Sequence, residues 1–320
     1  MAKQLLDIQD LKVRFKTDDG YVSTVNGVTF RIHEGETLAI VGESGSGKSV
    51  TSLALLGILP PNGEVYDGDM TFEDKKLRKI SKKEYRKLRG NEISMIFQEP
   101  MTALNPVFTI GFQLREALML HFNLSKEAAN KKGIEMLDHV GISDSERIMS
   151  RFPHNLSGGM RQRVMIAMAL SCNPKLLIAD EPTTALDVTI QSQILKLMKD
   201  LKKESNTSIL FITHDLGVVA EMADRVVVMY AGEVVEEAPV HELFENPKHP
   251  YTKGLMSSMP KVHEVVDDLF SIEGTVPNPS EMPTGCKFHP RCPLADDECK
   301  LVHPELEFIS ENHAKRCIKV

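Results

Sequence analysis

The sequence lacks the long apolar segments that would place it in a membrane. Among its 320 residues, no apolar run reaches the roughly 18 residues of a membrane-spanning helix. The opening residues Met-Ala-Lys-Gln-Leu-Leu-Asp also lack the apolar core of a secretory signal peptide. We therefore expect a cytoplasmic chain, and we expect any association with a membrane to come through a partner.

The chain also lacks an excess of positive charge. Its net charge of −7 argues against a protein whose main surface is a nucleic-acid groove. The most basic stretch, residues 73–90, includes acidic side chains, so we interpret it as a solvated helix face rather than a nucleic-acid or lipid patch. A hydrophobic content of 42% and a charged content of 26% are typical of a soluble globular protein.

One glycine-rich segment carries the strongest chemical signal. Residues 42–49 read Gly-Glu-Ser-Gly-Ser-Gly-Lys-Ser, which fits the phosphate-loop pattern G-x-x-x-x-G-K-[ST]. An apolar strand is predicted before it at 36–41 and an apolar helix after it at 50–56. Backbone N–H groups and the helix N-terminus of such a loop bind phosphates, while Lys48 reaches the outer phosphates and the Ser49 hydroxyl holds Mg²⁺. The alternative is a glycine-rich turn that binds nothing.

Polar residues end three further predicted strands, at 93–97, 175–179 and 209–213. Open α/β sheets bind their ligands at the carboxyl ends of strands, so these residues are candidates for ligand contact. Asp180 would lie near Mg²⁺ through water, and Glu181 would serve as general base for the attacking water, with helix capping as its alternative role. His214 would contact the γ-phosphate or serve a structural role. Gln98 would face the ligand.

The remaining segments suggest strands first and helices later. Residues 5–41 read as strands with a turn at 18–20, and Phe15 or Tyr21 there could stack on an adenine or serve only packing or surface roles. Residues 105–151 read as a helical insertion in which Ser125 begins a helix. The insertion ends in Leu-Ser-Gly-Gly-Met at 156–160, where a helix N-terminus could bind an anion or simply start a helix.

Taken together, these segments resemble the ATP-binding subunits of ABC transporters from about residue 5 to 240. The resemblance rests on residues 42–49, Gln98, 156–160, Asp180-Glu181, 185–187 and His214. It implies an α/β fold of the P-loop NTPase class, with a RecA-like core, an antiparallel β subdomain and a helical subdomain at about 100–170. It also implies that two subunits pack head to tail and enclose two ATP molecules between the phosphate loop of one and the 157–159 segment of the other.

The resemblance also implies roles for individual residues. Gln98 senses Mg²⁺ and the γ-phosphate, Glu181 polarises the water, His214 holds the transition state, and Asp187 communicates across the dimer. Phe15 best fits the position of the family's adenine-stacking aromatic, with Tyr21 left open. The implied catalytic residues are Glu181, His214, Gln98 and Lys48, and the implied Mg²⁺ contacts are Ser49, Gln98 and Asp180. The implied ATP contacts are Phe15 or Tyr21, Ser44, Gly45, Ser46, Gly47, Lys48, Ser49, Val50, Gln98, Ser157, Gly158, Gly159 and Asp187.

Two segments narrow the resemblance to importers of dipeptides and oligopeptides. They are Gln-Glu-Pro-Met-Thr-Ala-Leu-Asn-Pro at 98–106 and Asn-Pro-Lys-His-Pro-Tyr-Thr at 246–252. We therefore expect a nucleotide-binding domain at 1–245 and a C-terminal extension at 246–320, with a short helix at 251–259.

The importer resemblance implies a set of partners. They are a second ATPase subunit, identical or related; two membrane permease subunits contacted near residues 98–106; and, indirectly, an extracytoplasmic solute-binding protein. No nucleic acid is implied, and the chain would sit peripherally on the cytoplasmic face of the membrane.

Three other functions remain as alternatives. Nickel and other small-solute importers share the features of peptide importers. Soluble ABC-type ATPases acting on DNA or ribosomes usually carry coiled-coil or tandem-domain insertions, and none is visible here. A regulatory protein that binds ATP without hydrolysis conflicts with the presence of Glu181 and His214.

Four of the five cysteines crowd the last 35 residues, as Cys286, Cys292, Cys299 and Cys317. In a reducing compartment such a cluster favours metal over disulfides. Four thiolates suit an iron–sulfur cluster or tetrahedral zinc, and the absence of tight C-x₂-C pairs weakens zinc. The family resemblance implies a 4Fe–4S cluster, either a structural crosslink or a redox regulator, with free thiols as the alternative. His289, His303 and His313 lie close by and could substitute as ligands, but we expect them to be surface histidines.

Overall fold

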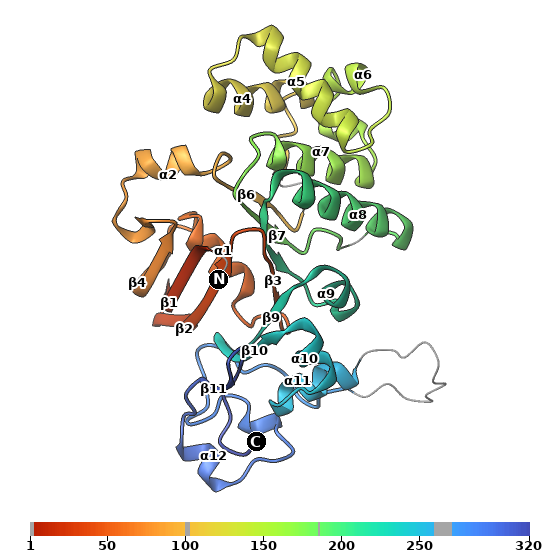
Figure 1. The fold of residues 1–320 in the computed structure, drawn as a ribbon. Coiled ribbons are helices and arrows are strands. Elements are labelled where there is room, and N and C mark those ends of the chain that lie inside the picture. The colour runs from red at the N-terminus through yellow and green to blue at the C-terminus, as the bar shows by residue number, and fades with distance from the viewer. Residues whose placement is uncertain (1–2, 100–102, 185, 259–270) are drawn as a thin grey trace. The chain divides into compact units, whose positions relative to one another are not determined.

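The computed structural model describes residues 3–99, 103–184, 186–258 and 271–320 (Figure 1). The chain forms two compact units. The first unit contains Glu34–Glu36 and Ile80–Phe211, and the second contains Lys3–His33, Thr37–Lys79 and Ile212–Val320. None of the helices in the described ranges is both long enough and apolar enough to cross a bilayer.

The first unit has a buried parallel sheet. Its strands lie in the order β8-β7-β6, with bounds Ser208–Ile212, Leu176–Asp180 and Ile93–Ile96. Every residue of these strands is buried, as expected for a sheet covered on both faces. Register pairs Ile93 with Leu176 and Ile96 with Ala179, so β6 and β7 end side by side. The residues that follow the two strands therefore meet at one edge.

Helices make up the rest of this unit. In Figure 1, α4, α5 and α6 lie together next to α7, and α7 also packs against β6. The bounds are α2 Lys82–Leu88, α4 Ile110–Phe122, α5 Lys126–His139, α6 Ser145–Met149, η2 Pro153–Asn155, α7 Gly158–Leu170 and α8 Val188–Ser205. The predicted start at Ser125 is confirmed, since its side chain caps α5 by accepting from the Ala128 N–H. The prediction of a solvated helix face at 73–90 is confirmed only for α2, where every Lys and Arg is exposed. Lys75-Lys76 instead form the strand β5, and Arg89 is half-buried.

The second unit contains an antiparallel sheet with strand order β2-β1-β4-β5. The bounds are β1 Gln4–Thr17, β2 Gly20–His33, β4 Gly63–Phe72 and β5 Lys75–Lys76, followed by η1 Leu77–Lys79. The alternating pattern that predicted strands before residue 41 is thus confirmed. Helix α1 (Lys48–Leu55) packs against β1, β2 and β4 of this sheet.

A second sheet in this unit has the order β11-β12-β10-β9-β3. Strands β3 and β9 are parallel, and the pairs toward β11 are antiparallel. The bounds are β3 Thr37–Val41, β9 Arg225–Tyr230, β10 Glu233–Pro239, β11 Glu307–Ser310 and β12 His313–Lys315, and the helices are α9 Leu216–Met222, α10 Val240–Glu245, α11 Pro250–Ser257, η3 His289–Arg291 and α12 Asp297–Leu301. The helix predicted at 251–259 is found as α11; residues 259–270 lie outside the described ranges.

The C-terminal residues join the core of this unit instead of forming a core of their own. Phe288 is buried in the same apolar cluster as Tyr230 of β9 and Tyr251 of α11. The ring centroids lie 4.7 Å apart for Tyr230–Tyr251 and 5.1 Å for Tyr230–Phe288. Strand β12 adds to the sheet through Glu236–Lys315 and Glu237–Ala314 pairs. This packing explains how a tail with few large apolar residues is stabilised.

Candidate functional site

The phosphate loop of the second unit has a backbone that requires glycine. Gly42 has φ +152°, and a Cβ there would lie 2.2 Å from the Met229 carbonyl oxygen. Gly47 has φ +96°, and its Cβ would lie 2.8 Å from the Thr24 carbonyl oxygen. The two glycines therefore permit a close approach between the loop and neighbouring backbone that no side chain allows.

Lys48 begins helix α1 and turns back over the loop. Its buried ammonium donates to the carbonyl oxygens of Gly42 at 2.7 Å and Glu43 at 3.0 Å. The same group lies 3.5 Å from the Ser46 hydroxyl. Among the described side chains none caps the helix at Gly47, and Ser49 and Val50 lie in its first turn. Such a helix start, with a buried cation beside it, suits a phosphate group.

The two aromatic candidates of the first hairpin differ in their surroundings. The Phe15 ring lies over Gly63, where a Cβ would come within 2.6 Å of Phe15 Cε1. Tyr21 is 56% exposed, and the Arg14 guanidinium sits 4.1 Å from its ring centroid. One face of Tyr21 is therefore occupied by a cation, whereas Phe15 is held against backbone.

In the first unit, Gln98 and Glu181 meet beyond the ends of β6 and β7. The Gln98 amide donates to Glu181 Oε2 at 3.0 Å, and the Thr184 hydroxyl donates to the same oxygen at 2.9 Å. Glu181 has φ +47°, a left-handed conformation that costs a residue with a side chain about 1–3 kcal/mol. Asp180 is buried at the last position of β7. The strand end thus holds two carboxylates, one of them in a fixed and strained position.

The 157–159 segment forms the start of α7. Ser157 caps the helix by accepting from the Met160 N–H at 3.3 Å. A Cβ on Gly158 would meet no atom within 4 Å, whereas one on Gly159 would lie 3.3 Å from Ile190 Cγ2. Asp187 likewise caps α8, accepting from the Ile190 N–H at 3.0 Å. Both polar residues have a local structural role, and Gly158 faces open space.

His214 follows β8 and belongs to the second unit, with an exposed side chain. The predicted nucleotide residues are thus divided between the units. Phe15, Tyr21, residues 44–50 and His214 lie in the second, whereas Gln98, Ser157, Gly158, Gly159, Asp180, Glu181 and Asp187 lie in the first. The structure brings Gln98 to Glu181 and Lys48 to the phosphate loop. Residues 100–102 and 185 of the predicted motifs lie outside the described ranges.

The four late cysteines line a single narrow hollow of the second unit, together with His249, Phe288 and Pro304. Burial raises the pKa of the Cys286 thiol, and the nearby Cys317 and Cys292 thiols raise it further. Burial likewise raises the pKa of Cys292, with Cys317 and Cys299 adding to the effect. Nearby backbone groups oppose these shifts, at Phe288 and His289 for Cys286 and at Leu294 and Ala295 for Cys292. The Lys319 N–H donates to the Cys317 sulfur at 3.4 Å.

The nearby histidines are occupied by other partners. His313 is buried, with Nε2 2.7 Å from Glu236 Oε1, so the expectation of a surface histidine is wrong there. His303 pairs with Glu233 at 2.8 Å, and His289 Nδ1 bonds the Cys286 carbonyl at 2.9 Å. Among the described side chains, no group of three or more His, Cys, Asp or Glu is arranged to hold a metal ion.

Sequence reasoning missed one set of residues beside the phosphate loop. Arg291 and Tyr251 of the C-terminal segment both bond Glu43. Arg291 is 248 positions from Glu43 in the sequence, so no local pattern connects the two. The only hint in the sequence was Glu43 itself, an acidic residue at the second position of the loop for which the motif predicts no role.

Two models of known protein families match parts of this chain. A family model described as "ABC transporter" matches residues 25–184. A second, described as "Oligopeptide/dipeptide transporter, C-terminal region", matches residues 235–299.

Similar full-length proteins and structures are also known. The oligopeptide transport ATP-binding protein AppD of Bacillus subtilis (strain 168) is 56% identical over 314 residues, covering 98% of this chain and 96% of that protein. The dipeptide transport ATP-binding protein DppD of the same organism is 51% identical, covering 98% and 94%. The dimeric structure of MJ0796, a bacterial ABC transporter cassette, aligns with a TM-score of 0.67 and 28% identity, covering 74% of this chain and 99% of that one.

Proposed function

The chain belongs to the ABC transporter family of ATP-hydrolysing, ATP-binding proteins, and from this premise we propose that it powers the import of dipeptides or oligopeptides through separate permease subunits. Its similarity to AppD and DppD, which are named for oligopeptide and dipeptide transport, supports a peptide substrate. The match of residues 235–299 to the oligopeptide/dipeptide transporter C-terminal region supports it too. The same ATPase role for nickel or another small solute is the alternative.

We assign the chemistry of hydrolysis to residues at the two sites described above. Lys48 and the N–H groups of residues 44–50 bind the phosphates, with Phe15, or alternatively Tyr21, on the adenine. Ser49, Gln98 and Asp180 supply the oxygen ligands that suit Mg²⁺, whose charge offsets that of the phosphates. Glu181 orients and deprotonates the attacking water, and His214 contacts the γ-phosphate.

One observation carries the assignment of Glu181. Two hydrogen bonds, from Gln98 and Thr184, hold one of its carboxylate oxygens at the strand end. A general base needs such a fixed position more than it needs an unusual proton affinity.

We propose that two ATPase subunits form the working unit, because each phosphate loop would receive residues 157–159 from its partner. The open space around Gly158 leaves room for a nucleotide held by another chain. The relative MJ0796 is dimeric, and one of its structures is bound to ADP and Pi. Asp187 would act near this interface in addition to capping α8.

A permease contact is proposed for an apolar surface of the first unit. Val107, Phe108 and Phe112 are exposed there, and the Phe108 and Phe112 rings stack with centroids 4.5 Å apart. Contiguous exposed apolar groups mark interaction surfaces. The surface adjoins the predicted contact segment 98–106, of which residues 100–102 are outside the described ranges. On this proposal the chain binds peripherally to the cytoplasmic face of a membrane, with no nucleic-acid partner.

For the extension at 246–320 we propose a 4Fe–4S cluster on Cys286, Cys292, Cys299 and Cys317. All four line one hollow, and the Lys319 N–H donates to the Cys317 sulfur at 3.4 Å, a kind of bond that occurs at cluster sites. A single zinc ion needs its four ligands about 2.3 Å from one point. Zinc on the same four thiolates is the alternative. We assign it a structural role, linking loops of the extension.

The test is ATP hydrolysis by the purified chain and its Glu181→Gln variant. We expect turnover to fall at least about 100-fold while ATP binding persists, because only proton transfer is lost. Size-exclusion chromatography with ATP should then detect a stable dimer. Glu146→Gln, a change at an exposed position of α6, is the control and should leave turnover unchanged. Wild-type turnover in Glu181→Gln would refute the proposed role.

A further inference from the structure

Every polar group of Glu43, the second residue of the phosphate loop, is engaged. Its carbonyl accepts from the Lys48 ammonium at 3.0 Å and from the Ser46 N–H at 3.2 Å. Its N–H donates to the Tyr251 hydroxyl at 2.9 Å. Its carboxylate pairs with Arg291. The two partners Tyr251 and Arg291 come from the C-terminal extension, whereas the loop's own contacts involve only the carbonyl.

The pair between Arg291 and Glu43 has two-point geometry. One guanidinium nitrogen lies 2.7 Å from Glu43 Oε2, and the other lies 3.1 Å from Oε1. The Arg291 side chain is only 4% exposed, and Glu43 is 32% exposed. Parallel bonds of this kind fix orientation as well as charge. Although burial opposes the charged form, bonds to Glu43 and Tyr230 hold the pKa of Arg291 above its ordinary value.

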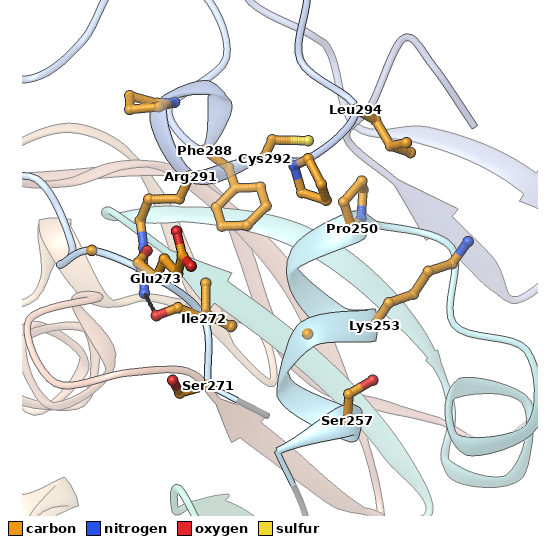
Figure 2. Close-up of a pocket in the computed structure, with 14 residues that line it drawn as sticks. Pro250, Lys253, Ser257, Ser271, Ile272, Glu273, Phe288, Arg291, Cys292 and Leu294 are labelled. Atoms are coloured by element: carbon orange, nitrogen blue, oxygen red, sulfur yellow. Dashed lines mark hydrogen bonds between the residues drawn. The ribbon is translucent and has the colours of Figure 1, made fainter. Parts of the chain in front are cut away.

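Arg291 is itself held by the extension. Its guanidinium donates to the carbonyl oxygens of Glu273 at 2.9 Å and Ile272 at 3.2 Å, and lies 3.5 Å from the Tyr230 hydroxyl. Figure 2 shows the side chain directed toward Ile272 and Glu273 in the wall of a cleft of about 1030 Å³, with Phe288 and Cys292 beside it. These contacts within the extension hold the Arg291 side chain in position independently of Glu43.

Tyr251, the second partner of Glu43, is also held in a fixed position. Tyr251 is fully buried, and its ring packs against Tyr230 and Phe288 with centroids 4.7 Å and 5.3 Å away. Burial, followed by the nearby Glu43 charge, raises the pKa of Tyr251, so the hydroxyl stays neutral. The Tyr251 hydroxyl oxygen accepts a hydrogen bond from the Glu43 N–H. The tyrosine ring cannot shift without disturbing the aromatic cluster.

The charge of Glu43 explains why such support would matter. An unpaired carboxylate beside a phosphate loop repels the phosphates that the loop binds. Arg291 cancels that charge, and its fork limits where the carboxylate can point. Arg291 also lies between Cys286 and Cys292, so its position depends on the folded cysteine segment.

We propose that Arg291 and Tyr251 are positioning residues of the nucleotide site, through which the C-terminal extension holds Glu43 and sets the affinity of the phosphate loop for nucleotide. The inference rests on the proposed binding of ATP at this loop and adds a regulatory input to it. A change that disturbs the extension would then weaken nucleotide binding without touching a group that contacts the nucleotide.

The test is the dissociation constant of a fluorescent ATP analogue, measured on the full-length chain together with its thermal midpoint. Arg291→Gln should raise the dissociation constant about tenfold and leave maximal turnover within about twofold. Tyr251→Phe, which removes one acceptor, should raise it about threefold. Arg291→Lys should fall between wild type and Arg291→Gln, because an ammonium keeps the charge but loses the fork.

Removal of the Glu43 charge should partly restore nucleotide binding in the Arg291→Gln variant. Glu43→Gln combined with Arg291→Gln should bind nucleotide more tightly than Arg291→Gln alone, because the uncompensated carboxylate is gone. The matched control is Arg225→Gln, which breaks another largely buried pair, with Glu237 at 2.7 Å. It should lower the thermal midpoint and leave the dissociation constant within about twofold of wild type.

Failure of this inference is separable from failure of the proposed function. An unchanged dissociation constant in both Arg291→Gln and Tyr251→Phe, with Lys48→Ala abolishing binding, would overturn the inference alone. If Lys48→Ala also left binding unchanged, the phosphate loop would not be the nucleotide site, and both would fall. Should Arg291→Gln not fold, Arg291→Lys and Tyr251→Phe decide the question by the same criterion.

Discussion

The side-chain amide of Gln98 donates to the carboxylate of Glu181 across 3.0 Å. The contact follows from parallel pairing, because β6 and β7 run in register and end at the same edge. It joins two residues 83 positions apart whose proposed roles are to sense Mg²⁺ and to activate water. A change at Gln98 should therefore alter the proton chemistry of Glu181 as well as metal binding.

Gln98→Glu should shift the pH dependence of ATP hydrolysis toward higher pH. Two carboxylates at hydrogen-bond distance repel each other, so one of them keeps its proton to higher pH. The acidic limb of the pH–rate profile should move up by about one unit or more. Gln98→Ala is the control, since it removes the hydrogen bond to the Glu181 carboxylate without adding charge, and its acidic limb should move up by less than that of Gln98→Glu. An unshifted limb in Gln98→Glu would argue that the contact is absent from the working site.

Gly158→Ala should reduce hydrolysis without reducing stability. A Cβ at this position meets nothing within 4 Å, and alanine favours the helical state over glycine. The thermal midpoint should therefore stay the same or rise. If Gly158 contacts the partner's nucleotide, the added methyl should lower turnover at least about tenfold. Full activity would place the partner's nucleotide elsewhere.

Each of the four late cysteines should be needed for iron, whereas the fifth should not. Cys292→Ser should lose most of the iron, the inorganic sulfide and the brown colour of the purified chain, because a cluster needs all its ligands. Cys172→Ser is the matched control, since Cys172 is buried in the first unit, and it should retain all three. Stoichiometric zinc with no sulfide in the wild-type chain would contradict the cluster.

Stability should fall in mild acid because of His249. Complete burial lowers its pKa from 6.5 to about 3, and its Nδ1 accepts the Tyr251 N–H at 3.1 Å, as only a neutral ring can. The folded chain keeps His249 neutral, whereas the unfolded chain protonates it below about 6.5. Its contribution is therefore complete above about pH 6.5 and is lost as pH falls toward 3, by about 1.4 kcal/mol per pH unit.

Urea unfolding between pH 5 and 7 measures this loss. His249→Asn retains a capping acceptor that does not titrate, so its stability should depend less steeply on pH over the same range. The comparison concerns the slope alone, because asparagine also packs differently against Phe288. Equal slopes in the two proteins would exclude His249 as the titrating group.

Local features of the fold were predictable from the sequence, whereas long-range contacts were not. Short patterns that act through backbone geometry account for the glycine loop, the Ser125 cap and the strands that lead to Asp180 and Gln98. Tertiary packing decided the rest. Leu120 falls at helical spacing with buried Leu114 and Leu118, yet it is 73% exposed.

The residues of the candidate site also include some that the sequence predicts and others that it does not. Sequence patterns identified the phosphate loop, the carboxylates and the four cysteines, since each is a local motif. They could not reveal that Glu43 pairs with Arg291 or that His313 is buried against Glu236, because each contact depends on where distant strands and loops pack. Short motifs therefore reveal the residues expected to contact a ligand. The residues that hold them in position become visible only once the chain is folded.

The central claim is that ATP hydrolysis by this chain drives peptide uptake. Its most direct test is uptake of labelled dipeptides and oligopeptides into membrane vesicles that contain the permease subunits co-purified with the chain, with ATP supplied on the cytoplasmic side. We predict ATP-dependent uptake with the wild-type chain and loss of at least about 90% of it with Glu181→Gln. Peptide uptake that continues at the wild-type rate with Glu181→Gln would contradict the account.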